Sequence, residues 1–138
     1  MQLEPTFLAQ PGAAGWQVSN PPVLALVPIR ASLALYDQAG MPALRAKSKT
    51  LTAYLQYLLA EQSGKKYEII TPSDPEERGC QVSILVRDRP LELLTALEEQ
   101  GISADFREPN IIRVAPVPFY NTFREVWRFA QIWARLTQ

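Results

Sequence analysis

The longest regular pattern in the sequence lies between residues 42 and 62, where leucines recur at helical spacing. Arg45, Lys49 and Gln56 fall outside the stripe that the leucines form, so one face of the segment is apolar and the rest is polar. The stripe consists of Leu44, Leu51, Leu55, Leu58 and Leu59. This pattern predicts an amphipathic helix whose apolar face packs on the rest of a domain.

Shorter segments follow this helix, some with the pattern of strands and others with the periodicity of helices. Residues 67–71, 81–86, 102–106 and 111–117 are typical of strands, and residues 91–100 predict a short helix with Leu91, Leu94 and Leu97 on one face. A last helix is expected from about Asn121, with Phe123, Trp127 and Trp133 in the core. The resulting order of elements predicts an α+β fold, in which helices pack on a small, mostly antiparallel sheet.

The N-terminal part of the chain has a different composition. Residues 1–22 contain four prolines and two glycines, which excludes a regular helix and predicts an extended loop or arm. Residues 23–36 are mostly apolar and fit either a buried helix or a buried strand, although Asn20 before Pro21 favours a helix with Asn20 as its N-cap. We therefore expect an arm over residues 1–22, linking helices over 23–62 and a small α/β domain over 63–138.

Composition excludes several classes of function. Lys plus Arg and Asp plus Glu both number 14, so the net charge is near zero. The chain therefore has no strong positive field that would attract nucleic acid or an anionic membrane. A single cysteine and the absence of histidine exclude a disulfide framework and a Ser-His-Asp or Cys-His catalytic arrangement, and they argue against a zinc or other metal site. No apolar run has the length of a membrane span and no signal peptide is visible, so a cytoplasmic protein is expected.

Several stretches of the sequence resemble, in order and over essentially its whole length, the C-terminal part of kynureninases. The first is Gly15-Trp16-Gln17-Val18-Ser19-Asn20-Pro21-Pro22, followed by Arg30-Ala31-Ser32-Leu33, Ala39-Gly40-Met41 and Leu44-Arg45-Ala46-Lys47-Ser48. The match continues with Ile70-Thr71-Pro72 and Glu77-Arg78-Gly79-Cys80-Gln81, and it ends with the stretch from Pro109 to Asn121. This collinearity is more specific than any one of the motifs.

The resemblance implies a fold and an activity. Kynureninases are pyridoxal-phosphate-dependent hydrolases of the aminotransferase-like superfamily (fold type I). Their large domain carries the lysine that binds the cofactor, and a smaller C-terminal domain follows a long linking helix. Their active site lies at a homodimer interface, where L-kynurenine or its 3-hydroxy form is hydrolysed to anthranilate or 3-hydroxyanthranilate and L-alanine. This reaction belongs to tryptophan catabolism and NAD biosynthesis.

The resemblance places the cofactor lysine upstream of this chain. The four lysines of the sequence are Lys47, Lys49, Lys65 and Lys66, and none matches the position of the family lysine. No catalytic residue is therefore assigned to these 138 residues, and the chain alone is expected to be inactive. Ile111 is a smaller departure, because some relatives have glycine at that position.

Arg113 is the first candidate for a binding residue. The resemblance gives it the role of binding the α-carboxylate of the substrate, and a guanidinium suits this role because it can donate two parallel hydrogen bonds to a carboxylate. Without the resemblance, a solvated arginine on the outer face of an edge strand is the simpler interpretation. Asn20 is the second candidate, for contact with the cofactor and the substrate across the dimer interface, and its alternative is a plain helix N-cap.

Three aromatic or hydroxyl side chains are weaker candidates. The resemblance places Trp16 and Ser19 near the cofactor and Tyr120 near the substrate, while packing at an interface or in the core is the alternative for the two aromatic residues. The charged turn formed by Glu76, Glu77 and Arg78 is expected to be solvated.

Two other functions remain open from the sequence. The chain could be a non-catalytic binding or dimerisation module derived from a pyridoxal-phosphate enzyme, in which case it should co-purify with an intact homologue or with a separate large domain. It could also belong to another branch of the superfamily, such as cysteine-desulfurase-like proteins. The stretches from Ser19 to Pro22 and from Arg113 to Asn121 make that branch the weaker alternative.

Overall fold

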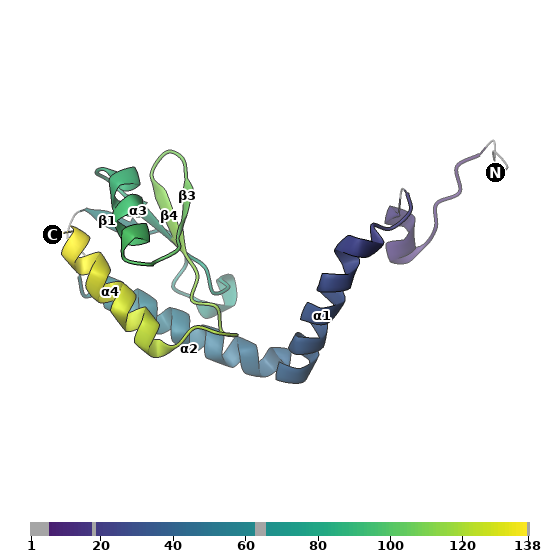
Figure 1. Cartoon of the computed structure of the whole chain (residues 1–138), viewed down its shortest axis with the longest axis horizontal. Helices are drawn as coiled ribbons and strands as arrows, with labels where there is room; N and C mark the ends of the chain where they lie inside the picture. Colours follow the sequence, from purple (N-terminus) through teal and green to yellow (C-terminus); the bar gives the residue numbers. More distant parts are fainter. Residues whose placement is uncertain (1–5, 18, 63–65, 138) are drawn as a thin grey trace. The chain divides into compact units, whose positions relative to one another are not determined.

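A computed structural model of the chain describes residues 6–17, 19–62 and 66–137. The chain divides into two compact units, Met1–Ala39 and Gly40–Gln138, and each is described by itself. Figure 1 labels most of the helices and strands of both units. The expected division into 1–22, 23–62 and 63–138 stays a prediction, and in the structure the helix that begins at Met41 belongs to the same unit as the sheet.

The first unit contains a short 3-10 helix, Gly12–Trp16, and helix α1, Val23–Ala39. The carbonyl of Pro22 accepts hydrogen bonds from the amides of Ala25 and Leu26, at 2.9 and 3.1 Å, so the helix cap is Pro22. The prediction that Asn20 caps this helix is therefore wrong, because the helix begins three residues further on. Gly40 follows α1 with a φ of +79°, a conformation that glycine adopts without strain.

The described residues of the second unit form three α-helices, four strands and a short 3-10 helix. In chain order they are α2 (Met41–Ala60), β1 (Tyr67–Ile69), η2 (Pro75–Glu77), β2 (Val82–Val86), α3 (Pro90–Glu99), β3 (Asp105–Arg107), β4 (Ile111–Val114) and α4 (Phe123–Thr137). The strands form one sheet in the order β1-β2-β4-β3, and every neighbouring pair is antiparallel. The predicted α+β fold is confirmed.

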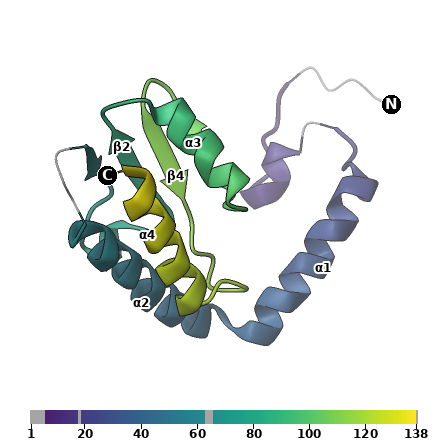
Figure 2. The same ribbon diagram turned by 60° about the vertical axis from the view of Figure 1, so that its left-hand side comes forward.

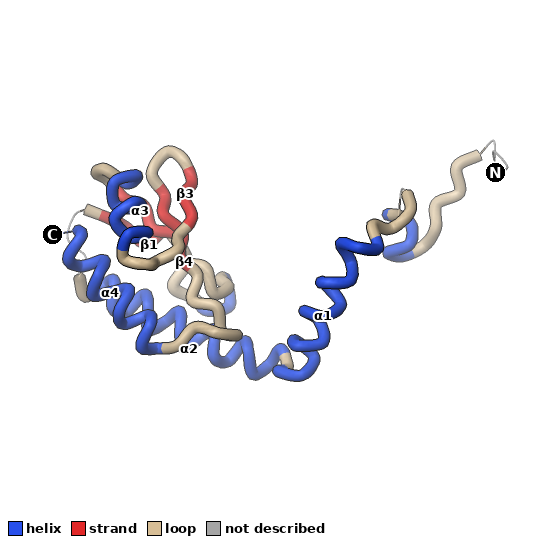
Figure 3. Tube along the Cα trace, in the orientation of Figure 1, coloured by secondary structure: helices blue, strands red, loops and turns tan. Residues whose placement is uncertain are grey.

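The core of the second unit lies between the sheet and its helices. Alternate residues of β2 and β4 are buried, and Ile84 and Ile112 among them are fully buried. They pack in one cluster with Leu51 of α2, Leu97 of α3 and Trp133 of α4, and these side chains are also fully buried. Figure 2 shows α2 and α4 side by side, and Figure 3 shows the strands gathered beside them. The residues that alternate with this core set point to the opposite face of the sheet.

Two of the expected apolar faces differ from the structure. In α3, Leu93 and Leu97 are buried whereas Leu91 is 59% exposed. In α4, Trp133 is in the core as expected, but Phe123 and Trp127 are about half exposed. At 100° per residue, the buried stripe of α4 runs through Val126, Phe129, Ala130 and Trp133, and Trp127 lies on its flank. Aromatic character alone did not identify the buried side of this helix.

Arg78 is a further correction. The turn was expected to be solvated, but Arg78 is only 9% exposed. The turn folds over the first half of α2, where Arg45 donates a hydrogen bond to the carbonyl of Pro75 and Lys49 forms an ion pair with Glu76. This tertiary contact buries a cation that the local sequence would leave in water.

No helix within the described residues is long and apolar enough to cross a membrane.

Candidate functional site

Arg113 is placed by the alternation of strand β4. Ile112 and Val114 point into the core, so Arg113 between them points to the opposite face of the sheet. Its register partners on the two neighbouring strands are Ser83 of β2 and Asp105 of β3. Because β4 lies between β2 and β3, it is an inner strand, and the interpretation of Arg113 as part of an edge strand is wrong. The pairing of β4 with a strand on each side therefore holds the backbone of Arg113 in place.

The guanidinium of Arg113 is held by one carboxylate. Its Nη2 donates a hydrogen bond to Oδ2 of Asp105, and the same oxygen lies 3.3 Å from Nη2 of Arg107. The Arg113 side chain is 26% exposed and that of Asp105 is 48% exposed, so the pair stabilises the fold by about 1 kcal/mol at most. Nε of Arg113 is buried and has no hydrogen-bond partner among the described residues. The guanidinium is thus oriented through Nη2, and its Nη1 has no hydrogen-bond or ion-pair partner among the described residues.

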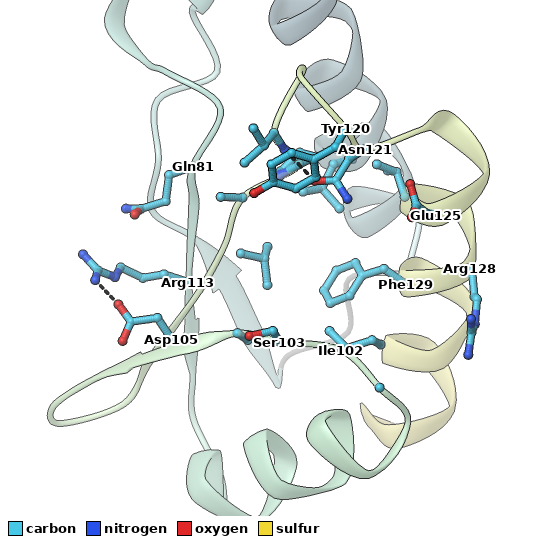
Figure 4. Close-up of a pocket in the computed structure, with 18 residues that line it drawn as sticks. Gln81, Ile102, Ser103, Asp105, Arg113, Tyr120, Asn121, Glu125, Arg128 and Phe129 are labelled. Atoms are coloured by element: carbon cyan, nitrogen blue, oxygen red, sulfur yellow. Dashed lines mark hydrogen bonds and ion pairs between the residues drawn. The ribbon is translucent and has the colours of Figure 1, made fainter. Parts of the chain in front are cut away.

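A pocket of about 540 Å³ lies next to Arg113 in the second unit. Arg113 and Asp105 line one side, and Phe129 lines the other side together with the charged Glu125 and Arg128. Figure 4 shows the Arg113 and Asp105 side chains directed toward one another, on the side of the pocket away from Phe129. A pocket that combines arginine donors with apolar side chains such as Phe129 suits an organic carboxylate.

The loop between β4 and α4 places Tyr120 at this pocket. Asn121 closes the loop, because its Oδ1 accepts a hydrogen bond from the amide of Val117 at 2.8 Å and its amide donates to the carbonyl of Val117 at 2.9 Å. Tyr120 lines the pocket and is 71% exposed. The structure thus brings Arg113 and Tyr120, two residues singled out from the sequence, to the same pocket.

A capping box fixes the start of α4 beside the same loop. The amide and hydroxyl of Thr122 donate to Oε2 of Glu125 at 2.7 and 2.8 Å, and the amide of Glu125 donates back to the Thr122 hydroxyl at 3.3 Å. The hydrogen bonds from Thr122 lower the pKa of Glu125 below its ordinary value. Glu125 also lines the pocket, so an ionised carboxylate is fixed on the wall opposite Arg113.

The other candidates lie in the first unit. Trp16 is in the 3-10 helix and is 87% exposed, and Ser19 and Asn20 are exposed in the segment between that helix and α1. Val18, in the same motif, lies outside the described residues. Whether Trp16, Ser19 and Asn20 meet Arg113 stays a prediction, because they belong to a different unit from the pocket.

Asp105 was not singled out from the sequence, although a signal for it exists. The two predicted strands 102–106 and 111–117 are joined through Pro109 and Asn110, and a hairpin centred on Pro109 pairs residue 105 with residue 113. The structure has this register, with a cis peptide bond between Glu108 and Pro109. A carboxylate opposite a candidate binding arginine could therefore have been identified from the strand pairing alone.

Comparisons with known proteins point to one family over most of the chain. Residues 44–133 match the family described as "Kynureninase C-terminal domain". The chain is 50% identical over 133 residues to a kynureninase of Xanthomonas campestris pv. campestris, and the alignment covers 94% of this chain and 31% of that protein. It is 53% identical over 130 residues to a kynureninase of Myxococcus xanthus, with 94% and 30% covered. A kynureninase of Xanthomonas oryzae pv. oryzae is 48% identical over 139 residues, with 96% and 33% covered.

The chain thus spans about a third of the length of the curated relatives that it matches. The family match includes the whole sheet, Arg113, Asp105 and Tyr120. It covers more than half of the chain, and the fold agrees with the α+β domain expected of the family. The chain therefore belongs to the kynureninase C-terminal domain family.

Proposed function

We propose that this chain forms the substrate-carboxylate side of a kynureninase active site. The reaction is the pyridoxal-phosphate-dependent hydrolysis of L-kynurenine or 3-hydroxykynurenine to anthranilate or 3-hydroxyanthranilate and L-alanine. The observation that carries the proposal is Arg113, which lies in the family-matching region, borders a pocket, and is oriented by Asp105 with donors to spare. The identity of about 50% to kynureninases over 94% of the chain supports the choice of substrate.

Arg113 would bind the α-carboxylate of the substrate. A carboxylate has two oxygens in one plane, and the guanidinium presents two parallel N–H donors in the same geometry. Because Asp105 and the inner strand already restrict the guanidinium, little side-chain freedom is lost when the substrate binds. Tyr120 would contact the substrate at the pocket, and Asn20, with Trp16 and Ser19, would contact the cofactor and substrate in a homodimer.

The described residues of this chain do not fit covalent attachment of the cofactor. Lys47 and Lys49 lie on α2, Lys49 is paired with Glu76, and Lys66 precedes β1. None of these three lines the pocket of Arg113, and Lys65 lies outside the described residues. In the family, pyridoxal phosphate supplies the electron sink for the reaction. The chain by itself would thus bind one end of the substrate without hydrolysing it.

The proposal can be tested with a chimera. The chain replaces the corresponding C-terminal third of the Xanthomonas campestris kynureninase, and anthranilate fluorescence is followed with L-kynurenine and pyridoxal phosphate. We expect turnover by the chimera and none by the 138-residue chain. Hydrogen bonds to charged groups contribute about 1.5 to 3 kcal/mol each, so Arg113→Ala should lower kcat/KM by about 100-fold.

Arg87→Ala is the matched control. Arg87 directly follows β2 and also forms an ion pair, with its Nη2 at 2.8 Å from Oε2 of Glu68. Its side chain is 56% exposed, and it does not line the pocket. Its removal should change kcat/KM by no more than about twofold. Equal losses for Arg87→Ala and Arg113→Ala would reject the role of Arg113. A folded but inactive chimera would favour the non-catalytic binding module, which should then capture an intact kynureninase subunit.

A further inference from the structure

The edge strand β3 presents two charged side chains on the face of the sheet where Arg113 lies. Asp105 and Arg107 are two residues apart and both exposed, whereas Phe106 between them packs against the core. Asp105 is the register partner of Arg113, and Arg107 is the register partner of Ile111. Arg107 therefore lies diagonal to Arg113 across the hairpin, at a separation that long side chains can span.

One carboxylate oxygen serves both arginines. Oδ2 of Asp105 accepts a hydrogen bond from Nη2 of Arg113 and lies 3.3 Å from Nη2 of Arg107. A guanidinium stays protonated at every pH at which the domain is folded, so two positive charges share one negative charge. The cluster formed by Arg107, Asp105 and Arg113 thus keeps one positive charge that its own carboxylate does not balance.

The second guanidinium changes what an anionic substrate meets at Arg113. In the pair of Arg113 and Asp105 alone the charges cancel, and Asp105 would repel an approaching carboxylate. Arg107 offsets the charge of Asp105 from outside the pocket, because Arg107 is not among the residues that line it. When a carboxylate binds to Arg113, two positive and two negative charges are in balance.

We propose that Arg107 is a positioning residue of the substrate-carboxylate site. It acts through Asp105, which it holds and partly neutralises, and so leaves the positive charge of Arg113 available to the substrate. This inference rests on the proposed function, because it takes Arg113 as the residue that binds the α-carboxylate. The class of substrate that it favours is an amino acid with a free, ionised carboxylate.

The simpler alternative is an ion pair that only stabilises the hairpin. The Arg107 side chain is 60% exposed and that of Asp105 is 48% exposed, and ion pairs with this exposure contribute little to folding. Loss of the Arg107 charge should therefore leave the domain folded and act on the binding of a charged substrate. In the 138-residue chain, Arg107→Gln should lower Tm by no more than about 5 °C.

Steady-state kinetics of the kynureninase chimera separate the two roles. Arg107→Gln keeps a polar side chain and removes the charge, so the KM for L-kynurenine should rise about fivefold while kcat changes by less than about twofold. Arg107→Lys keeps the charge and should restore KM to within about twofold of the original. For the uncharged α-carboxamide of L-kynurenine, Arg107→Gln should change kcat/KM by less than about twofold, since no substrate charge remains at Arg113.

Arg87→Gln is the matched control, because it removes the charge of an arginine whose ion pair with Glu68 lies outside the pocket. It should leave KM unchanged. An unchanged KM in Arg107→Gln, equal losses for L-kynurenine and its carboxamide, or a larger fall in Tm would overturn the role of Arg107. Arg113→Ala, measured in parallel, distinguishes the two failures. If Arg113→Ala lowers kcat/KM and Arg107→Gln does not, only this inference fails, whereas no effect of either variant would reject the proposed function as well.

Discussion

Leu97 and Leu91 lie on the same helix but in different surroundings, and the Leu→Ala change at each should have very different effects. Leu97 is fully buried among β4 and α4, whereas Leu91 is 59% exposed. Leu97→Ala removes three carbons, at about 0.8 kcal/mol for each buried methylene, and leaves a cavity that adds to the loss. We expect a decrease of about 3 kcal/mol in the free energy of unfolding of the second unit. In a domain of this size, that corresponds to a fall in Tm of roughly 12 to 24 °C.

Circular dichroism at 222 nm and tryptophan fluorescence measure this difference, with urea titrations at constant m-value as a second assay. Leu91→Ala is the matched control and should change the free energy of unfolding by about 0.5 kcal/mol or less, because its side chain is already in contact with water. If the two variants lost similar stability, or if Leu91→Ala lost more, the assignment of Leu93 and Leu97 as the buried side of α3 would be refuted.

Two further predictions concern pH. Glu125 has a pKa lowered by the hydrogen bonds from Thr122, so it stabilises the folded state above its ordinary value of 4.5 and this contribution is lost as the pH falls through the lowered pKa. Thr122→Ala should reduce the fall in the urea midpoint below pH 4.5, and Thr137→Ala at the other end of α4 should leave that fall unchanged. Tyr67 donates a hydrogen bond to the carbonyl of Leu59 at 2.6 Å, and burial raises its pKa above 10.0, so ionisation should destabilise the fold as the pH rises past that value. Tyr67→Phe should cost about 1 kcal/mol at neutral pH and abolish this alkaline loss, whereas Tyr57→Phe, at an exposed position, should do neither.

The periodicity of the sequence was sufficient for most of the fold. The stripe of leucines from residue 44 to 59 predicted α2, and alternation predicted the four strands, because burial on one side imposes these periods directly. The buried side of α3 could not be predicted, since leucines occur at positions 91, 93, 94 and 97 and any of several faces fits the pattern. The burial of Arg78 depends on a turn that folds over α2, which is a tertiary contact without a local signal.

The candidate site was predictable in part. Alternation along β4 is enough to turn Arg113 away from Ile112 and the core, and its carboxylate-binding role stays a prediction from the resemblance to kynureninases. Its partner Asp105 depends on the register of the β3-β4 hairpin, which a turn centred on Pro109 is sufficient to predict. The meeting of Asn20 with Arg113 stays a prediction, because it depends on how the two units, and two subunits, are placed.

The most direct test of the central claim compares two substrates in the chimera. L-kynurenine and its α-carboxamide differ only in the group that Arg113 is proposed to bind. With Arg113 present, the carboxamide should have a kcat/KM lower by about 100-fold, because a charged acceptor is lost. In Arg113→Ala the two substrates should differ by no more than about threefold, since the donor is gone. If the carboxamide remained 100-fold poorer in Arg113→Ala, another group would bind the carboxylate and the assignment of Arg113 would be contradicted.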